Sequence, residues 1–471
     1  MHTFEQYKKF IPLEVMSVLH ALVAAGGQGW LVGGSARDLL LGKIPSDWDI
    51  EVYGLEAKKL EPLLRKLGQC DYVGKQFGVY KLWIAIEGKA KLNLEIDIAL
   101  PRTEIKAGHG HVGFTVQSDP FIMPEQASLR RDFTINAMMF DAIEDAWLDL
   151  HNGQMDLHAK LLRHVSSAFV EDPLRPLRAM QLAARFGLKL DSQTAALCAQ
   201  MLSEASSLPT SRIWQEWKKW ALAPYPSFGL NAFHDMGWLP NYSELNALID
   251  CPQDKKWHPE GDVWTHTKLV LDAMASICDR EQSSADERLI LMLAALVHDL
   301  GKPQTTRVDA KGHVSCVDHE HVGVEIARDF LFSLGCPKKI VAVVMPLVAQ
   351  HVLHFAQSPE PANVRHLAHR LYPANIHLWE MLTEADAAGC PPLPASRPAL
   401  IWRELALAND CLMFSVKPIV TGKMLLIHAV SPSPRMGELL NQAYLAQMNG
   451  YFTDEASAHR WLEKTLLQER V

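Results

Sequence analysis

The chain has 471 residues, of which 48% are hydrophobic and 21% charged, and its formal net charge is −8. This length predicts about two to four domains, and the composition is that of a soluble globular protein. The longest uninterrupted apolar run, Leu289–Val297, is too short to span a bilayer, and residues 1–10 lack a signal pattern, so we expect no membrane partner. The eight cysteines include no C-x-x-C pair, which favours reduced thiols in the cytoplasm over disulfides or structural zinc.

Periodicity along the chain predicts an α+β fold. Residues 1–25 have the pattern of an amphipathic helix, and strands are predicted at 77–86, 91–100 and 137–141. Residues 103–127 contain several glycines and are predicted to form an irregular, flexible loop. Beyond about residue 150 the pattern is helical almost to the end. The clearest boundaries lie near the polar segment 250–260 and the Pro-rich segment 390–394, so we expect an α/β head followed by an all-α body.

A glycine pair follows the first predicted strand. At Gly33 and Gly34 the chain can turn tightly and leave its backbone N–H groups open to a phosphate. A helix is predicted over residues 36–41. Arg37 in the first turn of this helix can bind phosphate oxygens through a bidentate contact of its guanidinium. Asp38 can orient Arg37 or stabilise the turn. These four residues are our candidates for nucleotide binding.

Two aspartates stand one residue apart in the next segment. Asp47 and Asp49 lie in a stretch of period-two alternation, so both carboxylates should point to one side of a strand. Oxygen ligands at this spacing suit a hard cation such as Mg²⁺, which could activate a 3′-hydroxyl and neutralise a leaving pyrophosphate. Asp97 could add a third carboxylate or be an exposed strand charge. A glycine turn or an Asp-x-Asp alone is usually structural, but the combined order is specific and favours catalysis.

The segment RRDFTINA at residues 130–137 holds a second set of polar candidates. Arg131 and Asp132 could recognise a phosphate and a ribose hydroxyl, and Asn136 could donate or accept a hydrogen bond at either group. The alternative is a salt-bridged helix start, which is the commoner role of such a sequence.

The segment EDPLRPLR at residues 171–178 is predicted to open a helix, with Asp172 as its N-cap and Pro173 as its first residue. Arg175 and Arg178 then share a face with an acidic neighbour. An acid and an arginine on a rigid face could present donors and acceptors to a base edge, as a protein template would. The alternative is a set of intrahelical ion pairs, worth only about 0.3–0.5 kcal/mol each.

An acidic chain needs a local basic patch to bind nucleic acid. Residues 151–220 hold nine Lys and Arg against six Asp and Glu. This excess could face RNA or be an ordinary helical surface. Residues 211–219, which mix aromatic and basic side chains, are expected to pack within the body.

These segments together resemble one protein family. GGSARDLLLG with DWD, RRDFTINA, NGQMD at 152–156, EDPLRPLR and SRIWQEWKK occur in the order found in the bacterial class II tRNA nucleotidyltransferase/poly(A) polymerase family, across residues 28–220. The resemblance implies a polymerase-β-like head over residues 1–150 and a helical neck and body over 151–255. It also implies template-independent addition of CMP and AMP to tRNA, with ATP, CTP and tRNA as partners.

The resemblance implies roles for individual residues. Asp47 and Asp49 would be the Mg²⁺-binding catalytic carboxylates. Gly34 and Arg37 would contact the nucleotide, and Arg131 and Asp132 would recognise the sugar and phosphate. Asp172 and Arg175 would act as the base template, with Arg178 nearby. The chain departs from the family pattern at Ala36, where valine is usual, and at Gln181, where a further arginine is usual. The second change removes a cation near the template, so it bears on base selection.

The second half of the chain contains scattered histidines and aspartates. His298 and Asp299 directly follow the apolar run ending at residue 297, within the sequence HDLGKP. Both side chains need partners once they are buried, and a metal would supply one. Imidazole and carboxylate ligands without thiolates suit Mn, Fe, Ni, Co or Mg.

This pattern resembles the HD-domain phosphohydrolases found fused to some bacterial tRNA nucleotidyltransferases. The resemblance implies an all-α HD domain with a helical tail over residues 256–471. It implies four metal ligands, His266, His298, Asp299 and Asp386, and it offers two residues for a second metal or a substrate phosphate, His319 and His351.

We therefore expect an enzyme that completes tRNA 3′ ends and also hydrolyses phosphoesters such as 2′,3′-cyclic phosphates. A poly(A) polymerase, or an enzyme that adds only A or only CC, is the first alternative. Such enzymes often carry a strongly basic C-terminal extension, whereas residues 454–471 are of mixed charge, which disfavours this alternative. A hydrolase whose head merely binds RNA, and a non-catalytic RNA-binding protein, are the alternatives from other classes.

Overall fold

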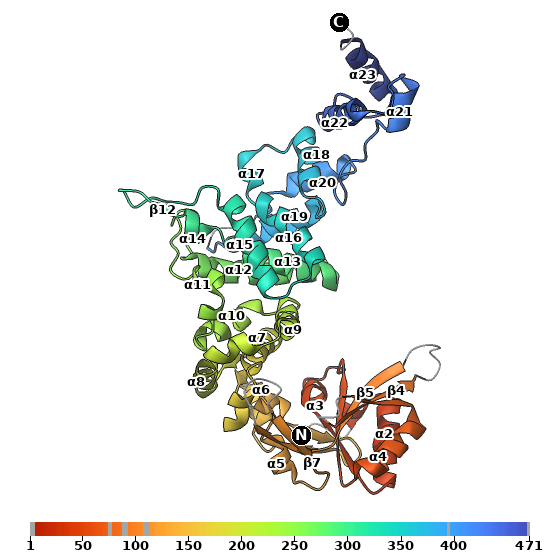
Figure 1. Cartoon of the computed structure of the whole chain (residues 1–471). Helices are drawn as coiled ribbons and strands as arrows, with labels where there is room; N and C mark the ends of the chain where they lie inside the picture. The colour runs from red at the N-terminus through yellow and green to blue at the C-terminus, as the bar shows by residue number, and fades with distance from the viewer. Residues whose placement is uncertain (1–4, 74–77, 87–92, 107–113, 393–395, 469–471) are drawn as a thin grey trace. The chain divides into compact units, whose positions relative to one another are not determined.

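The computed structural model describes residues 5–73, 78–86, 93–106, 114–392 and 396–468, and it divides into two compact units (Figure 1). The first unit consists of Met1–Glu216 and Phe228–Asn241, and the second of Trp217–Ser227 and Tyr242–Val471. The boundary expected near residues 250–260 lies shortly after the second unit resumes at Tyr242. The finer division at residues 150 and 255 stays a prediction.

The first unit contains a seven-stranded mixed sheet in the order β3-β4-β5-β2-β1-β8-β9. Only β2 and β5 pair in parallel, and the other neighbours are antiparallel. The predicted segments 77–86, 91–100 and 137–141 contain β4, β5 and β8, while residues 77, 91 and 92 lie outside the described residues. The strands are β1 Gln28–Val32, β2 Trp48–Tyr53, β3 Gln69–Val73, β4 Val79–Ala85, β5 Asn93–Ala99, β8 Met139–Asp141 and β9 Ala146–Leu148.

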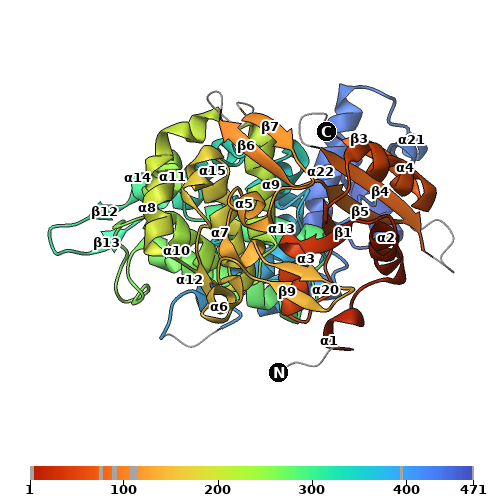
Figure 2. The ribbon, with the colours of Figure 1, turned by 90° about the horizontal axis from the view of Figure 1, so that it is seen from below.

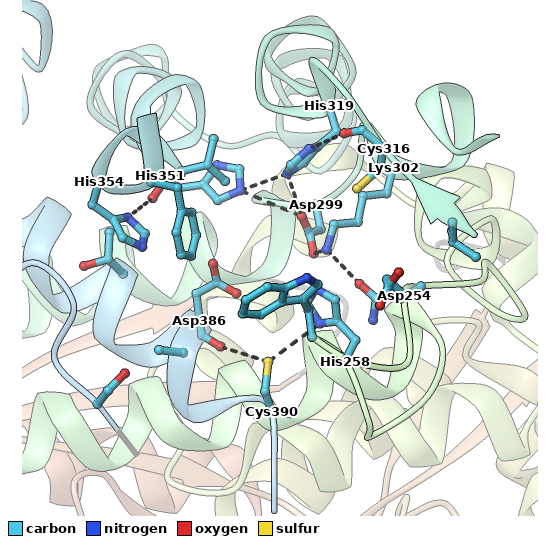
Figure 3. Close-up of a pocket in the computed structure, with 18 residues that line it drawn as sticks. Asp254, His258, Asp299, Lys302, Cys316, His319, His351, His354, Asp386 and Cys390 are labelled. Carbon is cyan, nitrogen blue, oxygen red and sulfur yellow. Dashed lines mark hydrogen bonds and ion pairs between the residues drawn. The ribbon is translucent and has the colours of Figure 1, made fainter. Parts of the chain in front are cut away.

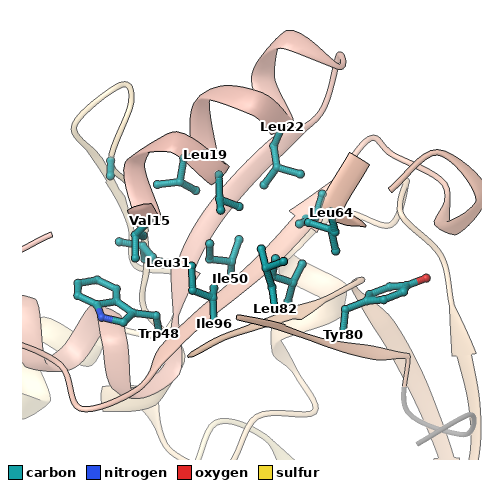
Figure 4. Packing of buried hydrophobic residues seen from close by; sticks show 14 of the residues in the cluster. Val15, Leu19, Leu22, Leu31, Trp48, Ile50, Leu64, Tyr80, Leu82 and Ile96 are labelled. Carbon is teal, nitrogen blue, oxygen red and sulfur yellow. The ribbon is translucent and has the colours of Figure 1, made fainter. Parts of the chain in front are cut away.

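Helices α2 (Leu13–Ala24) and α4 (Ala57–Leu67) contribute to the hydrophobic core on one face of this sheet, as Figure 4 shows. Leu19 and Leu22 of α2 face Leu31 and Ile50 of the central strands. Burial of each such side chain stabilises the fold by roughly 1.5–3 kcal/mol. A Cβ at Gly29 would lie 2.8 Å from Leu19 Cδ2, so glycine is needed where the helix approaches the sheet.

The segment predicted as an irregular loop at 103–127 folds differently, and that prediction was wrong. Strands β6 (Arg102–Lys106) and β7 (Phe114–Ser118) form an antiparallel pair, seen side by side in Figure 2, and α5 follows at Pro124–Ser128. Residues 107–113, the middle of the predicted loop, lie outside the described residues. The pairing uses backbone groups, so it does not need the apolar alternation on which strand prediction depends.

The remainder of the first unit is mainly helical. Gly187, with φ +62°, ends α7 in the left-handed region, and Asp191 caps α8 by accepting hydrogen bonds from two backbone N–H groups. Helix α7 begins at Arg175, so the prediction that Asp172 caps the helix and Pro173 opens it was wrong. The elements are η1 Thr134–Asn136, α6 Gly153–His158, β10 Leu161–Leu162, η2 Ser167–Glu171, α7 Arg175–Phe186, β11 Lys189–Leu190, α8 Ser192–Gln200, η3 Leu202–Ser207 and η4 Leu239–Asn241. Two further helices, α9 Thr210–Ala221 and α10 Pro226–Asp235, belong partly to each unit.

The second unit is almost entirely helical, as predicted. Asp262 caps α12, and Ser284 and Glu287 form a capping box at the start of α13. The elements are α11 Ser243–Asn246, α12 Val263–Arg280, α13 Ala285–Val297, α14 Lys302–Thr305, β12 Arg307–Val308, β13 Val314–Ser315, α15 His319–Ser333, α16 Lys338–Gln350, α17 Leu353–Ala356, α18 Pro361–Arg370, α19 Ile376–Ala388, α20 Leu400–Ala408, α21 Gly422–Ile427, α22 Pro434–Met448 and α23 Glu455–Gln468.

One stretch of this unit, Lys338–Ala356, is long and apolar enough to cross a membrane by length and composition alone. Its main part, α16, packs against α13, α15 and α19 and ends beside His351, which is buried among other polar groups. One face of α16, which includes Val341, Val344 and Val348, is therefore buried against other helices of the unit.

Candidate active sites

The first candidate site is a group of carboxylates on the face of β2 opposite the hydrophobic core. Trp48 and Ile50 point into the core, and Asp49 between them points away from it. Asp49 is directly opposite Asp97 in the parallel pairing of β2 with β5. The Oγ of Ser35 accepts a 2.8 Å hydrogen bond from Asp49 N–H and donates a 3.0 Å hydrogen bond to the carbonyl of Asp47, which fixes the start of the strand.

The electrostatics of this group fit a cation. Burial, together with the charges of Asp97 and Asp47, raises the pKa of Asp49 to about 6 against the opposing effects of Arg131 and Arg37. Lys81 forms ion pairs with Asp97 and Glu95, so Asp97 already has one cationic partner. Carboxylates that repel one another at a partly buried position are a donor set for a hard divalent cation.

The glycine pair lies beside these carboxylates. Helix α3 (Gly33–Leu40) begins at the pair itself, three residues before the predicted start. Gly33 has φ +63°, and a Cβ on it would lie 3.4 Å from Asp49 Oδ2. Glycine therefore permits the left-handed turn, and a Cβ at this position would be in van der Waals contact with the Asp49 carboxylate.

The predicted nucleotide-binding residues of α3, η1 and α7 form one chain of polar contacts. Arg37 contacts Asp38 at 2.7 Å and donates a 2.6 Å hydrogen bond to Asn136 Oδ1. Asn136 Nδ2 donates a 3.2 Å hydrogen bond to Asp132, and Asp132 forms a 2.6 Å ion pair with Arg178. The structure thus brings together residues from positions 37 to 178, but it places Arg37 as a buried residue whose guanidinium stacks 4.3 Å above Phe186.

Glu51 is a site residue that the sequence did not reveal. It is two residues beyond Asp49 on the same face of β2, and it accepts hydrogen bonds from Arg130 at 2.8 Å and from Arg131 at 2.9 Å. Burial alone would raise the pKa of Glu51, but the two guanidiniums, Arg131 more than Arg130, hold it below its ordinary value. Glu51 therefore anchors Arg131 next to the carboxylate group. The period of two could have indicated it.

The predicted template residues do not lie on one open face. Arg175 is buried and donates hydrogen bonds to the carbonyls of Ala168, at 2.7 Å, and Arg130, at 2.6 Å. Asp172 accepts a 3.0 Å hydrogen bond from Leu174 N–H and lies 3.8 Å from a guanidinium nitrogen of Arg212. In this conformation the guanidinium of Arg175 is bound to two backbone carbonyl groups, and Asp172 is the more accessible of the two residues.

The second candidate site is a cluster of histidines and aspartates in the helical unit (Figure 3). Five helices contribute to it. The cluster consists of His266 in α12, His298 and Asp299 directly after α13, His319 at the start of α15, His351 directly after α16 and Asp386 in α19. All six predicted residues are thus gathered in one place.

Asp299 lies between two groups of ligands. Its Oδ2 is 3.2 Å from His298 Nε2 and 3.7 Å from His266 Nε2, and the latter nitrogen is 2.9 Å from Asp386 Oδ1. Its Oδ1 is 3.4 Å from His319 Nε2 and 3.8 Å from His351 Nε2. One carboxylate therefore offers one oxygen to each group.

The histidines are oriented by their second nitrogens. Nδ1 of His298, His319 and His351 lies 2.7–2.9 Å from the backbone carbonyl three residues earlier in each case. A ring that donates from Nδ1 keeps its Nε2 as a lone pair directed at the cluster. Burial lowers the pKa of His351 to about 3, with a further contribution from His298 and His319, so this ring is neutral and able to bind a metal.

The burial and spacing of the polar atoms in the cluster fit a metal site. Asp299 Oδ1 is buried and accepts no hydrogen bond, and Asp299 Oδ2 and His298 Nε2 have ion-pair contacts in place of hydrogen bonds. A buried polar atom without a hydrogen bond costs free energy unless a ligand satisfies it. Two sets of buried donors, His266 with His298 and Asp386, and Asp299 with His319 and His351, are each close enough to hold one ion.

Residues around the cluster were not predicted. Lys302 Nζ contacts Asp299 Oδ2 at 2.7 Å and donates a 2.7 Å hydrogen bond to Gln253 Oε1. Glu260 Oε1 lies 2.9 Å from His258 Nδ1 and 2.8 Å from His266 Nδ1. Lys302 stands within HDLGKP, and Glu260 stands within HPEGDVWTH at residues 258–266, which ends at the predicted ligand His266. Their places beside predicted ligands are the signal that could have identified them.

A cavity of about 480 Å³ opens onto this cluster. Its inner end is polar, and its walls include aromatic and aliphatic side chains. The lining residues are Gln253, Asp254, Trp257, His258, Asp299, Lys302, Val314, Cys316, His319, His351, Val352, His354, Phe355, Thr383, Asp386, Ala387, Cys390 and Ser396.

Comparison with known proteins matches both halves of the chain. Residues 29–163 match the poly A polymerase head domain, and residues 263–380 match the HD domain. The multifunctional CCA protein of Xanthomonas oryzae is 34% identical over 371 residues, which are 76% of this chain and 85% of that protein. The multifunctional CCA protein of Vibrio vulnificus is 35% identical over 349 residues, which are 73% and 79%.

Solved structures share the fold. The Bacillus stearothermophilus CCA-adding enzyme in complex with CTP has a TM-score of 0.66 at 19% identity and covers 97% of this chain and 98% of its own. The Thermotoga maritima CCA-adding enzyme complexed with tRNA has a TM-score of 0.61 at 16% identity and covers 98% of each chain. The expected fold class is confirmed, and from the matched domains and curated relatives this chain belongs to the family of bacterial multifunctional CCA proteins.

Proposed function

We propose that this protein adds CMP and AMP to the 3′ end of tRNA and that its helical unit hydrolyses phosphoesters. The observation that carries the first activity is the placement of Asp49 between Asp97 and the glycine-opened N-terminus of α3. Curated relatives named multifunctional CCA protein and fold neighbours solved with CTP, ATP and tRNA support it. With these substrates, the protein would act in the cytoplasm.

The transfer needs few covalent changes. The 3′-hydroxyl oxygen of tRNA forms a bond to the α-phosphorus of CTP or ATP, the bond to pyrophosphate breaks, and the hydroxyl proton is lost. We propose that Asp47 and Asp49, with Asp97 beside them, hold Mg²⁺. The ion would make the hydroxyl a better nucleophile and offset charge on the triphosphate.

The chain's own residues would position the reactants. The backbone N–H groups at Gly33 and Gly34 can donate hydrogen bonds to phosphate oxygens, because no Cβ shields them. We assign Arg131 and Asp132 to the triphosphate and ribose. Glu51 holds Arg131, and Asn136, which accepts a hydrogen bond from Arg37, holds Asp132, while Asp38 pairs with Arg37. Template reading by Arg175 requires its guanidinium to leave the carbonyls of Ala168 and Arg130, and template reading by Arg178 requires it to leave its ion pair with Asp132. Asp172 is the more accessible residue.

The observation that carries the second activity is Asp299, whose two oxygens face separate sets of buried histidines. We propose that His266, His298, Asp386 and Asp299 hold one divalent ion and that Asp299, His319 and His351 hold a second. Mn, Fe, Co, Ni or Mg suits these ligands. In the hydrolysis a water oxygen bonds to phosphorus, one ester P–O bond breaks, and the departing alkoxide takes up a proton. A bound ion would supply the activated water, and Lys302 lies where it can contact a phosphate oxygen.

Nucleotide incorporation into tRNA lacking its 3′ CCA tests the first activity. We expect complete CCA with CTP and ATP together and only CC with CTP alone. Incorporation of ATP alone into arbitrary RNA, without use of CTP, would instead identify a poly(A) polymerase. Addition by Asp49→Asn at the wild-type rate would refute the assignment of the carboxylates.

A further inference from the structure

Four side chains from three segments meet at the Nδ1 side of the His266 ring, while Nε2 of the ring faces the histidine–aspartate cluster. Nδ1 of His266 and Nδ1 of His258 lie 2.8 Å and 2.9 Å from the same oxygen of Glu260. The Sγ of Cys390 lies 3.7 Å from Nδ1 of His266 and 3.6 Å from Nδ1 of His258. The four donor atoms all lie within 4.8 Å of one another, and Figure 3 shows Cys390 and His258 facing each other beside the cavity.

This group is buried, and it contains a polar atom that has no partner. The side chains of His266 and Glu260 are 0% and 2% exposed, and Cys390 is 8% exposed. The second carboxylate oxygen of Glu260, Oε2, is buried without a hydrogen-bond partner. Such an atom costs free energy unless a ligand satisfies it. Because a carboxylate oxygen accepts and does not donate, the ligand that it lacks is a cation or a hydrogen-bond donor.

The donor atoms of this group are those that zinc prefers. One thiolate, two imidazole nitrogens and one carboxylate oxygen make a complete tetrahedral set. Zn–N bonds of about 2.0 Å and a Zn–S bond of about 2.3 Å place sulfur and nitrogen about 3.5 Å apart in a tetrahedron, close to the 3.6 Å and 3.7 Å found for Cys390. The oxygen of Glu260 would need to move only about 0.5 Å from each imidazole nitrogen. The thiol distinguishes this group from the cluster, whose ligands are nitrogen and oxygen.

His266 belongs to both groups, but a neutral imidazole has only one lone pair. When Nε2 binds a metal in the cluster, the proton of the ring is on Nδ1, which donates to Glu260. Zinc at Nδ1 would move this proton to Nε2, which would then donate to Asp386 Oδ1 at 2.9 Å. Cys390 would release its thiol proton to water. The cluster would thereby lose one ligand, so a metal on one side of the ring weakens metal binding on the other.

We propose that His258, Glu260, Cys390 and Nδ1 of His266 form a further metal site, selective for zinc, which takes His266 away from the cluster and so inhibits hydrolysis. The zinc site follows from the four donors themselves. The inhibition rests in addition on the proposed hydrolase function, and the two parts are tested by separate measurements.

Titration of the EDTA-treated, full-length chain with Co²⁺ tests the zinc site. A bond between cobalt and a thiolate absorbs in the near ultraviolet, whereas cobalt held only by nitrogen and oxygen in the cluster does not contribute. We expect this absorption to saturate in the wild type, to disappear when zinc is added, and to be missing in Cys390→Ser. Cys251→Ser is the matched control and should keep it, because Cys251 is also buried and contacts a polar group, the hydroxyl of Thr306. Absence of the absorption from the wild type, or its persistence in Cys390→Ser, would overturn the site.

A second measurement on the site needs no variant. Cys390 lines the cavity, so a small alkylating reagent such as iodoacetamide can reach its thiol. Zinc should slow the alkylation of Cys390 in the wild-type chain, as followed by mass spectrometry of its peptide. Alkylation at the same rate with and without zinc would show that Cys390 is not a ligand.

Hydrolysis of a 2′,3′-cyclic phosphate with Mn²⁺ tests the inhibition, each chain being compared with its own rate before zinc is added. We expect Cys390→Ser to need at least about tenfold more zinc than wild type for half inhibition, since even groups that only support a metal ligand contribute that much to metal affinity. Equal sensitivity of the two chains to zinc would overturn the inhibition. If the wild-type chain hydrolyses nothing with Mg, Mn, Co or Ni, the proposed hydrolase function fails, and the cobalt absorption still decides the zinc site.

Discussion

Glu260 Oε1 lies 2.8 Å from Nδ1 of His266, on the side of the ring opposite the metal-ligand cluster. Burial alone would raise the pKa of Glu260, but its hydrogen bonds with His258 and His266 lower it to about 2, so it is a carboxylate at neutral pH. A carboxylate on Nδ1 fixes the tautomer that leaves Nε2 free to bind a metal, and it makes that nitrogen more basic.

Glu260→Ala should therefore weaken divalent metal binding at the cluster by about 10–100-fold. Titration of hydrolysis against free metal concentration measures this effect, and Glu260→Gln, which can still accept a hydrogen bond, should lose less. CCA addition by the first unit should not change. Unaltered metal dependence in Glu260→Ala would show that Glu260 has no part in positioning His266.

Asp49→Asn should reduce CCA addition by at least about a hundredfold, because it removes a charged ligand from the carboxylate group. Single-turnover incorporation of CMP into tRNA measures the effect. Asp71→Asn, at an exposed position of β3 in the same sheet, is the matched control and should keep the wild-type rate. Equal rates in the two variants would contradict the role of Asp49.

In the absence of metal, Asp49→Asn should increase the stability of the folded chain. The folded-state pKa of Asp49 is raised from 3.8 to about 6, so the folded chain loses stability as pH rises through this window. Asn avoids that loss. Thermal melting in EDTA should show Asp49→Asn equal to wild type below about pH 4 and more stable above about pH 6, by at most about 3 kcal/mol. A variant less stable than wild type at pH 8 would contradict the raised pKa.

Gly33→Ala tests the close approach of α3 to Asp49. Both Gly33 and Gly42 have φ in the left-handed region, +63° and +69°, so alanine at either position should cost about 1 kcal/mol of stability. A Cβ at Gly33 meets Asp49 Oδ2 at 3.4 Å, whereas one at Gly42 meets nothing within 4 Å. CCA addition should therefore fall about tenfold or more in Gly33→Ala and stay normal in Gly42→Ala. Equal activity in both variants would show that Gly33 has no part in the catalysis of CCA addition.

His298→Ala tests whether the two centres are independent. It removes a ligand whose Nε2 faces Asp299 and Asp386, so hydrolysis should fall below detection. CCA addition should remain within about twofold of wild type, since the carboxylate group lies in the other compact unit. Parallel assays of both reactions on one preparation give the answer, and a joint loss with normal melting would show that the two activities share a centre.

Local patterns predicted much of this molecule. The alternation around Asp49 indicated a strand, but β2 begins at Trp48, so Asp47 lies before the strand and its shared side with Asp49 stays a prediction. The HDLGKP motif indicated a buried polar pair, and His298 and Asp299 are buried. The orientation of His298, His319 and His351 by carbonyls three residues earlier follows from helix-end geometry, which spacing alone does not encode.

Long-range pairing accounts for what the sequence did not predict. Arg175 was expected to face a base, but its guanidinium holds the carbonyls of Ala168 and Arg130, the second of them 45 residues away. Such contacts are fixed only when the whole unit folds. The β6–β7 pair was missed for a different reason, because the glycines within residues 103–127 favoured a loop prediction.

The ligand cluster also has a consequence for the stability of its unit. His266 and Asp386 are 120 positions apart in the chain, yet they face the same ion-sized space. An ion bound there would act as a removable cross-link that closes a long loop and unites five helices. Because the unfolded chain offers no such preformed cage, metal supply would regulate how readily this half of the protein unfolds, even when no substrate is present.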